Sequence, residues 1–332
     1  MEEKIKVSLS KNTLELLKKD CLDFKIVKEN GQPNMNAFIN TLIVNFYEIF
    51  SASEESLHDE IKHALSIVPS VYKEKVFEDI VKIYAKRMDF DQTKKESTTF
   101  SFKPTKISEK ALLYIDNVLL QSESISSFYR RMFIAYAQKT KNEREKIIHK
   151  DNFELIQKAI SRQTQVCILL QSGSIMNNVS VFSISPAKDE LFNYVLLYDN
   201  KNNVTLRLAS VKNVTLLSSS SFIPDKNVQL FVRQIACAPQ YPMYPSDNEP
   251  IKVQLTEKGK TLFEKIYLYR PTPVNIDNDI YTFNCSANQL LYYFERFGEN
   301  ALILSPKKLG IFMRNYYYYS LKKYKTIYKG DN

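Results

Sequence analysis

One tyrosine and one arginine stand in a stretch that is otherwise apolar. Residues 192 to 214, FNYVLLYDNKNNVTLRLASVKNV, form two apolar runs joined by DNKNN, with Tyr194 in the first run and Arg207 in the second. A tyrosine offers a stacking face and a hydroxyl, and an arginine offers a planar fork for a phosphate or a base edge. Such a pair can contact a nucleotide; the alternative is that Tyr194 packs inside and Arg207 snorkels or pairs with Asp199.

No other set of residues has the composition of a catalytic or metal site. Two of the three histidines are five residues apart, a spacing that separates them around a helix. The four cysteines are scattered without pairs at metal-ligand spacing, and the six glycines form no phosphate-binding loop. The sequence therefore predicts a protein that is not an enzyme and that has no catalytic residue, metal or cofactor.

The composition bounds the class of protein. The chain has 332 residues, 44% of them hydrophobic, which is enough for two or three modest cores. Lys and Arg number 46 against 37 Asp and Glu, and the net charge of +9 favours polyanionic partners. No apolar run approaches the roughly 18 residues that cross a bilayer, and no secretory start is present. We therefore expect a soluble cytoplasmic protein with reduced thiols and no membrane association.

The first 140 residues begin with a strand, a helix and a second helix. KIKVSLS, residues 4 to 10, alternates apolar with basic or polar side chains, which predicts a strand with one face toward a core. Ser10 can cap the next helix, and FINTLIVNF in the second helix places apolar residues along one face. The outward side chains of the strand are Lys4, Lys6 and Ser8.

The same plan recurs roughly 90 to 98 residues later. TTFSFKP alternates in the same way, Ser108 is the expected cap of a helix stapled by Ile107 and Leu112, and FYRRMFIAY repeats the apolar spacing of FINTLIVNF. One strand alone cannot satisfy its backbone, so two units in one chain predict an intramolecular pair. The outward side chains of this strand are Thr99, Ser101 and Lys103.

This doubled arrangement resembles the ribbon-helix-helix family, in which two such units interlock and their strands form an antiparallel ribbon. The resemblance implies that the outward residues of both strands enter the major groove of DNA. Thr99 and Ser101 are short and neutral and reach base edges less well than Arg, Asn or Gln, so a scaffold with solvated lysines is the alternative. Two packing helices are expected between the units, parted near Pro69.

From about residue 141 a helix leads into five short strands with polar turns, a pattern typical of a small barrel. A strand ending in a proline loop, an aromatic strand ending in Tyr-Asp and an Arg-Leu strand resemble the WYL domain, which has an Sm-like or SH3-like barrel. Its namesake triplet falls on residues 193 to 195, where only the tyrosine is kept. The resemblance implies a nucleic-acid site formed by Asn193, Tyr194, Arg207 and Lys212.

The last third resembles the C-terminal extension that often follows WYL domains. In ERFGENALILSPKKL, Gly298 ends a helix and Pro306 begins the last one. RNYYYYSLKKYKTIYKG then interleaves aromatics with lysines, as in surfaces that stack bases and neutralise phosphates. The alternative is that at least two of the tyrosines at 316 to 319 pack and the lysines form an ordinary basic tail.

Together these segments predict an α+β multidomain protein. A helical ribbon-helix-helix domain of two β-α-α units is expected at 1–140, followed by a connecting helix and an Sm/SH3-like β-barrel WYL domain at 141–222. An α/β extension with a dimerisation role is expected at 223–332. This order resembles the WYL accessory proteins of type VI-D CRISPR RNA-targeting systems. The resemblance implies a homodimeric, non-enzymatic protein that binds single-stranded RNA and enhances RNA targeting and cleavage by a CRISPR effector nuclease. Two alternatives are a ligand-sensing WYL transcription regulator that binds operator DNA through the ribbon, and a structural adaptor that binds neither nucleic acid.

Overall fold

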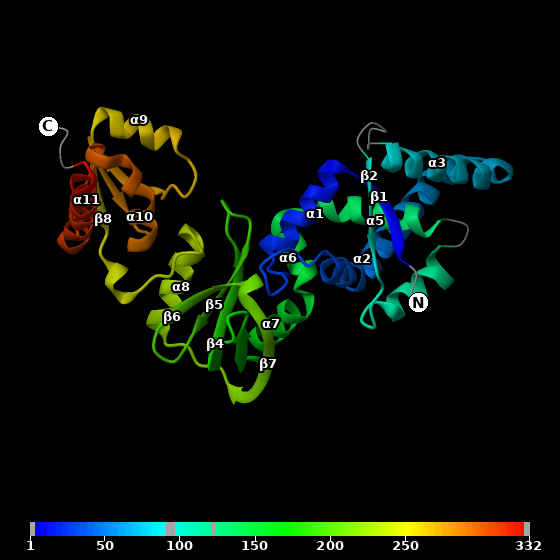
Figure 1. The fold of residues 1–332 in the computed structure, drawn as a ribbon, viewed down its shortest axis with the longest axis horizontal. Coiled ribbons are helices and arrows are strands. Elements are labelled where there is room, and N and C mark those ends of the chain that lie inside the picture. The colour runs from blue at the N-terminus through cyan, green and yellow to red at the C-terminus, as the bar shows by residue number, and fades with distance from the viewer. Residues whose placement is uncertain (1–3, 91–96, 121–123, 329–332) are drawn as a thin grey trace. The chain divides into compact units, whose positions relative to one another are not determined.

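The chain divides into two compact units, Met1–Asp151 and Asn152–Asn332 (Figure 1). The computed structural model describes residues 4–90, 97–120 and 124–328. Both units mix helices with antiparallel sheets, as the predicted α+β class requires. The three-domain division stays a prediction, because the second unit holds both the predicted barrel and the predicted extension. Within the described ranges, no helix is long and apolar enough to span a membrane.

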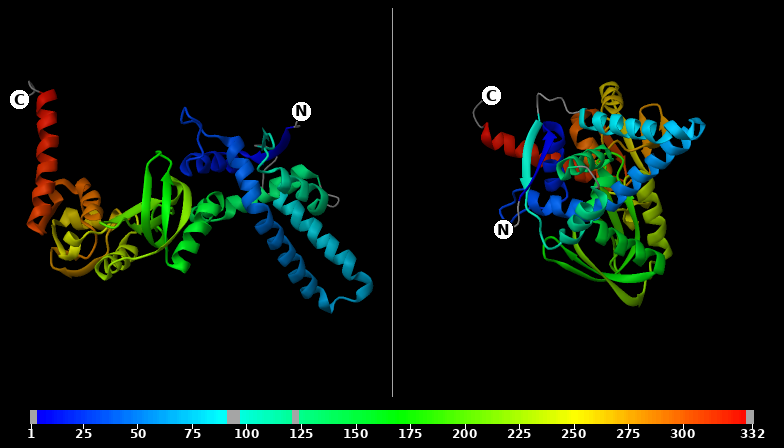
Figure 2. Two further views of the ribbon diagram at one scale, coloured as in Figure 1. Left: turned by 90° about the horizontal axis from the view of Figure 1, so that it is seen from below. Right: turned by 90° about the vertical axis from the view of Figure 1, so that its right-hand side faces the viewer.

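The first unit contains one two-stranded ribbon surrounded by helices. Its elements in chain order are β1 (Ile5–Ser10), α1 (Lys11–Asp23), α2 (Met35–Ala64), η1 (Leu65–Ile67), α3 (Ser70–Phe90), β2 (Ser97–Phe102), α4 (Glu109–Tyr114), η2 (Ile115–Leu119), α5 (Ile125–Gln138) and α6 (Lys141–Ile148). The two helices expected between the units are separated near Pro69, and the first of them is continuous with α2. Figure 2 shows α2 and α3 as a helical hairpin.

The two predicted strands pair with each other in antiparallel register. Ile5 lies opposite Phe102, and the pairing runs to Ser10 opposite Ser97. The inward residues Val7 and Leu9 are completely buried. They share a core with the predicted apolar faces of α2 and α5, whose ten residues are all buried. These are Phe38, Ile39, Leu42, Ile43, Phe46, Phe128, Tyr129, Met132, Phe133 and Tyr136.

The start of α4 differs from the sequence prediction. Ser10 caps α1 by accepting the N–H of Thr13, as expected, but Ser108 makes no such cap to α4. Its buried hydroxyl donates instead to the side-chain oxygen of Asn40 on α2. Ile107 is 74% exposed, so the predicted staple is wrong. The reason is that a buried amide on α2 needs a hydrogen-bond partner, and Ser108 supplies it.

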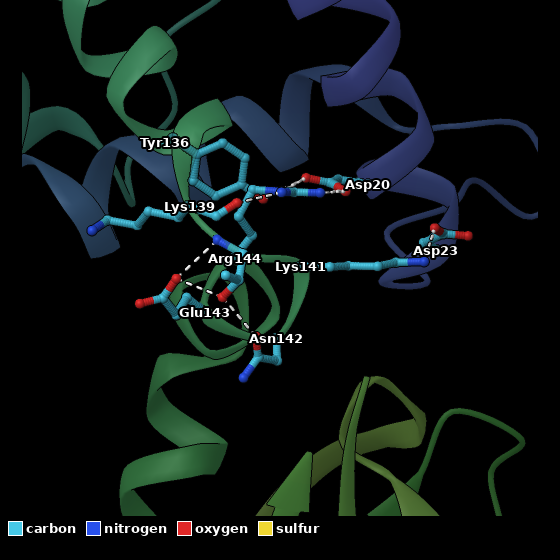
Figure 3. A network of polar contacts seen from close by, with 9 residues as sticks. Asp20, Asp23, Tyr136, Lys139, Lys141, Asn142, Glu143 and Arg144 are labelled. Atoms are coloured by element: carbon cyan, nitrogen blue, oxygen red, sulfur yellow. Dashed lines mark hydrogen bonds and ion pairs between the residues drawn. The ribbon is translucent and has the colours of Figure 1, made fainter. Parts of the chain in front are cut away.

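A buried ion pair holds α6 against α1 and α5 (Figure 3). The guanidinium of Arg144 donates to both carboxylate oxygens of Asp20 at 2.6 and 3.1 Å, and the Tyr136 hydroxyl donates to the same carboxylate at 3.0 Å. Burial and the nearby Asp20 raise the pKa of Tyr136 well above its ordinary value. The connecting helix predicted from residue 141 is two helices in the structure, α6 and α7 (Lys150–Arg162), which are separated by the buried His149.

The second unit contains two antiparallel sheets, each with its own apolar core. The five-stranded sheet has the order β6-β5-β4-β3-β7, and α7 contributes Ile156 and Ala159 to its core. Its strands are β3 (Thr164–Leu170), β4 (Ile175–Pro186), β5 (Asn193–Tyr198), β6 (Asn203–Arg207) and β7 (Val211–Ser220), with η3 (Leu208–Ser210) between the last two. No pairing joins the edge strands β6 and β7 in the described residues, so the expected closed barrel is not what the structure has.

The rest of the second unit is an α/β arrangement built on a four-stranded sheet of order β11-β8-β10-β9. Its elements are α8 (Asp225–Cys237), η4 (Pro245–Asn248), β8 (Ile251–Leu255), α9 (Glu257–Lys265), β9 (Pro273–Asp277), β10 (Ile280–Phe283), α10 (Ala287–Phe294), η5 (Glu295–Asn300), β11 (Ala301–Ser305) and α11 (Lys307–Ile327). Gly298 has φ +57° at the turn that leads into β11 and the last helix follows Pro306, as the sequence predicts.

Candidate nucleic-acid interface

The six predicted ribbon residues lie together on the outward face of β1 and β2. Lys6 is paired in register with Ser101, and Ser8 with Thr99, whose hydroxyl oxygens are 2.8 Å apart. Alternation places Lys4 and Lys103 on the same face at the end of the ribbon, Lys4 just before β1 and Lys103 just after β2. Ser8 is half-buried and the other five are exposed.

The ribbon face combines lysines with short hydroxyl side chains. Three lysines and three hydroxyl side chains share it, and none of these six residues is acidic. A two-stranded ribbon fits the major groove of duplex DNA, and lysines neutralise phosphates of either nucleic acid. Arg130 on α5 was not predicted from the sequence. Its Nε donates to the backbone oxygen of Ser8 at 2.9 Å and so ties α5 to β1. The only sequence signal for it was its place in FYRRMFIAY.

Tyr194 and Arg207 are direct register partners across β5 and β6. Paired residues of an antiparallel sheet place their side chains side by side on one face, so the structure brings these two together. Asp199 lies in the turn at the far end of this hairpin, where its carboxylate accepts the N–H groups of Lys201 and Asn202 at 2.9 and 2.7 Å. The alternative pairing of Arg207 with Asp199 is therefore wrong.

The other two predicted residues of this site lie on the opposite face of β5 and on another strand. Asn193 is completely buried on the opposite face of β5, because successive side chains of a strand alternate. Lys212 is exposed on β7, the edge strand farthest from β6 in the strand order. The structure thus brings Tyr194 and Arg207 together and buries Asn193, and Lys212 lies on β7, which follows Arg207 after η3.

Two residues of the loop before β5 contact the pair and were missed by the sequence reasoning. The guanidinium carbon of Arg207 lies 3.2 Å from the centre of the Phe192 ring, a stacked contact. The hydroxyl of Tyr194 donates to the carboxylate of Glu190. Phe192 precedes Tyr194 by two positions, so the alternation of an extended chain places the two side chains on one face, and this is the sequence signal that could have found it.

A cluster of tyrosines lies near Glu190. Burial and the nearby Glu190 carboxylate raise the pKa of Tyr269 to about 12. The ring centre of Tyr269 is 5.2 Å from that of Tyr292, and Tyr241 packs against both. The backbone N–H of Tyr269 donates to the carboxylate of Asp189, so the loop that carries Glu190 contacts the C-terminal part of the same unit.

The terminal helix α11 presents most of its tyrosines to solvent. Tyr317 is half-buried and donates to the backbone oxygen of Glu295 at 3.0 Å. The other tyrosines of the run are about half exposed or more: Tyr316 45%, Tyr318 59% and Tyr319 60%. Only one of the four consecutive tyrosines packs, fewer than the two that the alternative required, because the core of the four-stranded sheet reaches along α11 only to Met313 and Tyr317.

Comparison with known proteins gives a likeness in fold. No protein-family model matches the chain, and no curated protein matches it in sequence. A solved structure described as a CRISPR Cas-related protein aligns with a TM-score of 0.65 and 20% sequence identity, over 99% of this chain and 95% of that one. The chain therefore shares its overall fold with this CRISPR Cas-related protein. Proteasome accessory factor B/C (PafBC) of Arthrobacter aurescens aligns with a TM-score of 0.23 and 14% identity, over 68% of this chain and 39% of that one, which does not indicate a shared fold.

Proposed function

We propose that the chain is a non-enzymatic accessory protein of a CRISPR RNA-targeting system. It binds single-stranded RNA and enhances RNA targeting and cleavage by the effector nuclease, in systems of type VI-D. The observation that carries this proposal is the likeness of nearly the whole chain to a CRISPR Cas-related protein. Two surfaces suited to nucleic acid and a net charge of +9 support it.

The finer domain identities belong to the same proposal. Two strand-helix-helix units whose strands pair in antiparallel register support a ribbon-helix-helix domain. For the five-stranded sheet, consecutive strands β3 to β6 pair in sequence, and β7 returns to the free edge of β3 after the short η3 turn. This topology supports a WYL domain of the Sm-like or SH3-like kind.

The chemistry of binding follows from the two surfaces. The guanidinium of Arg207 can stack on a base or donate to a phosphate, and the Tyr194 hydroxyl can donate to a phosphate oxygen. The ribbon lysines lower the electrostatic free energy of a polyanion without reading its sequence. We therefore assign base and phosphate recognition to the Tyr194–Arg207 site and general attraction to the ribbon.

Binding to matched single-stranded RNA and duplex DNA over a salt series tests the proposal. Fluorescence anisotropy is expected to show tighter binding to the RNA, with an affinity that falls as salt rises. Stimulation of effector cleavage, measured with and without the chain at saturating guide, is the second readout. Tight duplex binding with little RNA binding would exclude the RNA-binding role.

The ribbon face favours one second candidate, a transcription regulator. Its six residues project from an antiparallel ribbon that can enter a major groove, and a ligand sensed at the Tyr194–Arg207 site would then control operator binding. A preference for palindromic duplex in the same experiment distinguishes this function from the first.

We also propose that the chain acts as a homodimer through residues 223–332. The exposed aromatic side chains of α11 support this assignment, since an exposed apolar row is typical of an interaction surface. Multi-angle light scattering of the full chain and of a Tyr316→Ser, Tyr319→Ser variant measures it, and a monomeric wild-type chain would exclude it.

A further inference from the structure

The loop that joins β4 to β5 occupies the Tyr194–Arg207 site. Glu190 accepts the hydroxyl of Tyr194, and the ring of Phe192 covers one face of the Arg207 guanidinium at 3.2 Å. Both residues come from the segment 187–192, AKDELF. The two groups through which the site would hold RNA are thus engaged by the chain itself.

These two contacts reproduce the chemistry of a nucleotide. A carboxylate at a tyrosine hydroxyl offers a negatively charged acceptor where a phosphate oxygen would lie, and a ring on a guanidinium takes the position of a stacked base. We propose that residues 187–192 are a built-in occupant of the nucleotide site, with Glu190 in place of a phosphate and Phe192 in place of a base, and that RNA binds by displacing them. This inference rests on the proposed function and names two residues that limit RNA affinity.

The loop is held in a strained conformation. Its ends are joined by hydrogen bonds from the N–H of Ala187 to Phe192 at 2.8 Å and from the N–H of Leu191 to Ala187 at 3.0 Å. Leu191 is 44% exposed and has φ +57°, a backbone conformation that an L-residue with a large side chain rarely adopts. Strain of this kind persists where neighbouring contacts hold the segment in place, and Glu190 and Phe192 supply such contacts.

Tyr269 in the C-terminal part of the unit contacts the same loop. Its backbone N–H donates to the carboxylate of Asp189 at 3.2 Å. Its pKa is raised to about 12 by burial and by the nearby Glu190 carboxylate. Removing the Tyr269 hydroxyl takes away a polar neighbour of Glu190 without altering either residue of the RNA site.

Anisotropy titrations with a fluorescein-labelled single-stranded oligouridylate test the inference in the full chain. Glu190→Gln keeps the size of the side chain and removes its charge, and we expect it to raise RNA affinity by about five- to tenfold. Glu154→Gln, on the exposed surface of α7, changes the net charge equally and is the matched control. Phe192→Leu retains apolar packing without the ring, and Tyr269→Phe removes one hydroxyl; both are expected to raise RNA affinity by about two- to threefold.

The outcomes separate the inference from the function on which it rests. If the wild-type chain binds the RNA and Glu190→Gln binds no more tightly than Glu154→Gln, the inference is overturned and the proposed function stands. If the gain persists after Arg207→Ala is added to Glu190→Gln, it does not act at this site and the inference is also overturned. Binding that is detected only in Glu190→Gln supports displacement. If neither chain binds, the proposed function fails and the inference fails with it.

Discussion

The ribbon and the Tyr194–Arg207 hairpin are both two-stranded antiparallel pairings, yet they present their polar residues differently. The outward side chains of the ribbon are mostly exposed, and the side-chain hydrogen bond between Ser8 and Thr99 stays within the face itself. On the hairpin, the two chemically useful residues are half-buried and contacted by Glu190 and Phe192. The two pairings therefore differ in how accessible their polar groups are: those of the ribbon face solvent, and those of the hairpin already contact a neighbouring loop.

The largest expected effect is a loss of stability confined to the first unit, which contains the ribbon. Asp20→Ala leaves Arg144 buried without its carboxylate, which should lower the free energy of unfolding of the first unit by about 3 to 5 kcal/mol. Hydrogen exchange of the full chain is expected to accelerate in α1, α5 and α6 and to stay unchanged in β3 to β7.

Asp23→Ala is the matched control for this change. It lies on the same helix and removes a pair with Lys141 whose side chains are 27% and 20% exposed, which should cost at most about 1 kcal/mol. Equal acceleration in the two variants would show that the Asp20–Arg144 pair does not hold α6 in place.

The next effect concerns the hairpin site. Arg207→Ala is expected to weaken RNA binding by about tenfold, because it removes both a stacking plane and a charge. Arg207→Lys keeps the charge without the planar fork and should recover little of the affinity while preserving the dependence on salt. Arg162→Ala, at the exposed end of α7, is the control. An unchanged affinity in Arg207→Ala would exclude this site.

Removing lysines from the ribbon should mainly change the salt dependence of RNA affinity. Lys6→Ala with Lys103→Ala removes two phosphate contacts, which should reduce the slope of log affinity against log salt by about 1.4 for a single strand. Lys62→Ala with Lys82→Ala removes the same charge from the α2–α3 hairpin and is expected to leave the slope unchanged. If the two double variants behave alike, the ribbon makes no specific contribution to binding.

Lys212→Ala should have the smallest effect. Lys212 is exposed on β7 and offers a single charge that salt screens, so its loss should change RNA affinity by less than about 0.5 kcal/mol. A loss comparable to that of Arg207→Ala, measured in the same titration, would return Lys212 to the site.

Much of both regions was predictable because a strand with one buried face fixes the direction of every side chain. Alternation placed Lys6, Ser8 and Thr99 on one face, and the polar turn DNKNN set Tyr194 opposite Arg207. The same rule, applied fully, also buries Asn193, which the resemblance alone had placed in the site. The prediction of a closed barrel was wrong, because the pattern of strands along the sequence does not specify whether the two edge strands of the sheet pair with each other.

The sequence predicted most of the helices and strands, their apolar faces and the β5–β6 hairpin, because these depend on residues within a few positions of one another. Only the tertiary structure decided that Ser108 satisfies Asn40, 68 residues away, and that Arg144 neutralises Asp20, 124 residues away. It also decided that the hydroxyl of Tyr194 donates to Glu190 and that the N–H of Tyr269 donates to Asp189, 80 residues away. Buried polar and charged groups must find partners wherever the fold places them, and no local pattern specifies that choice.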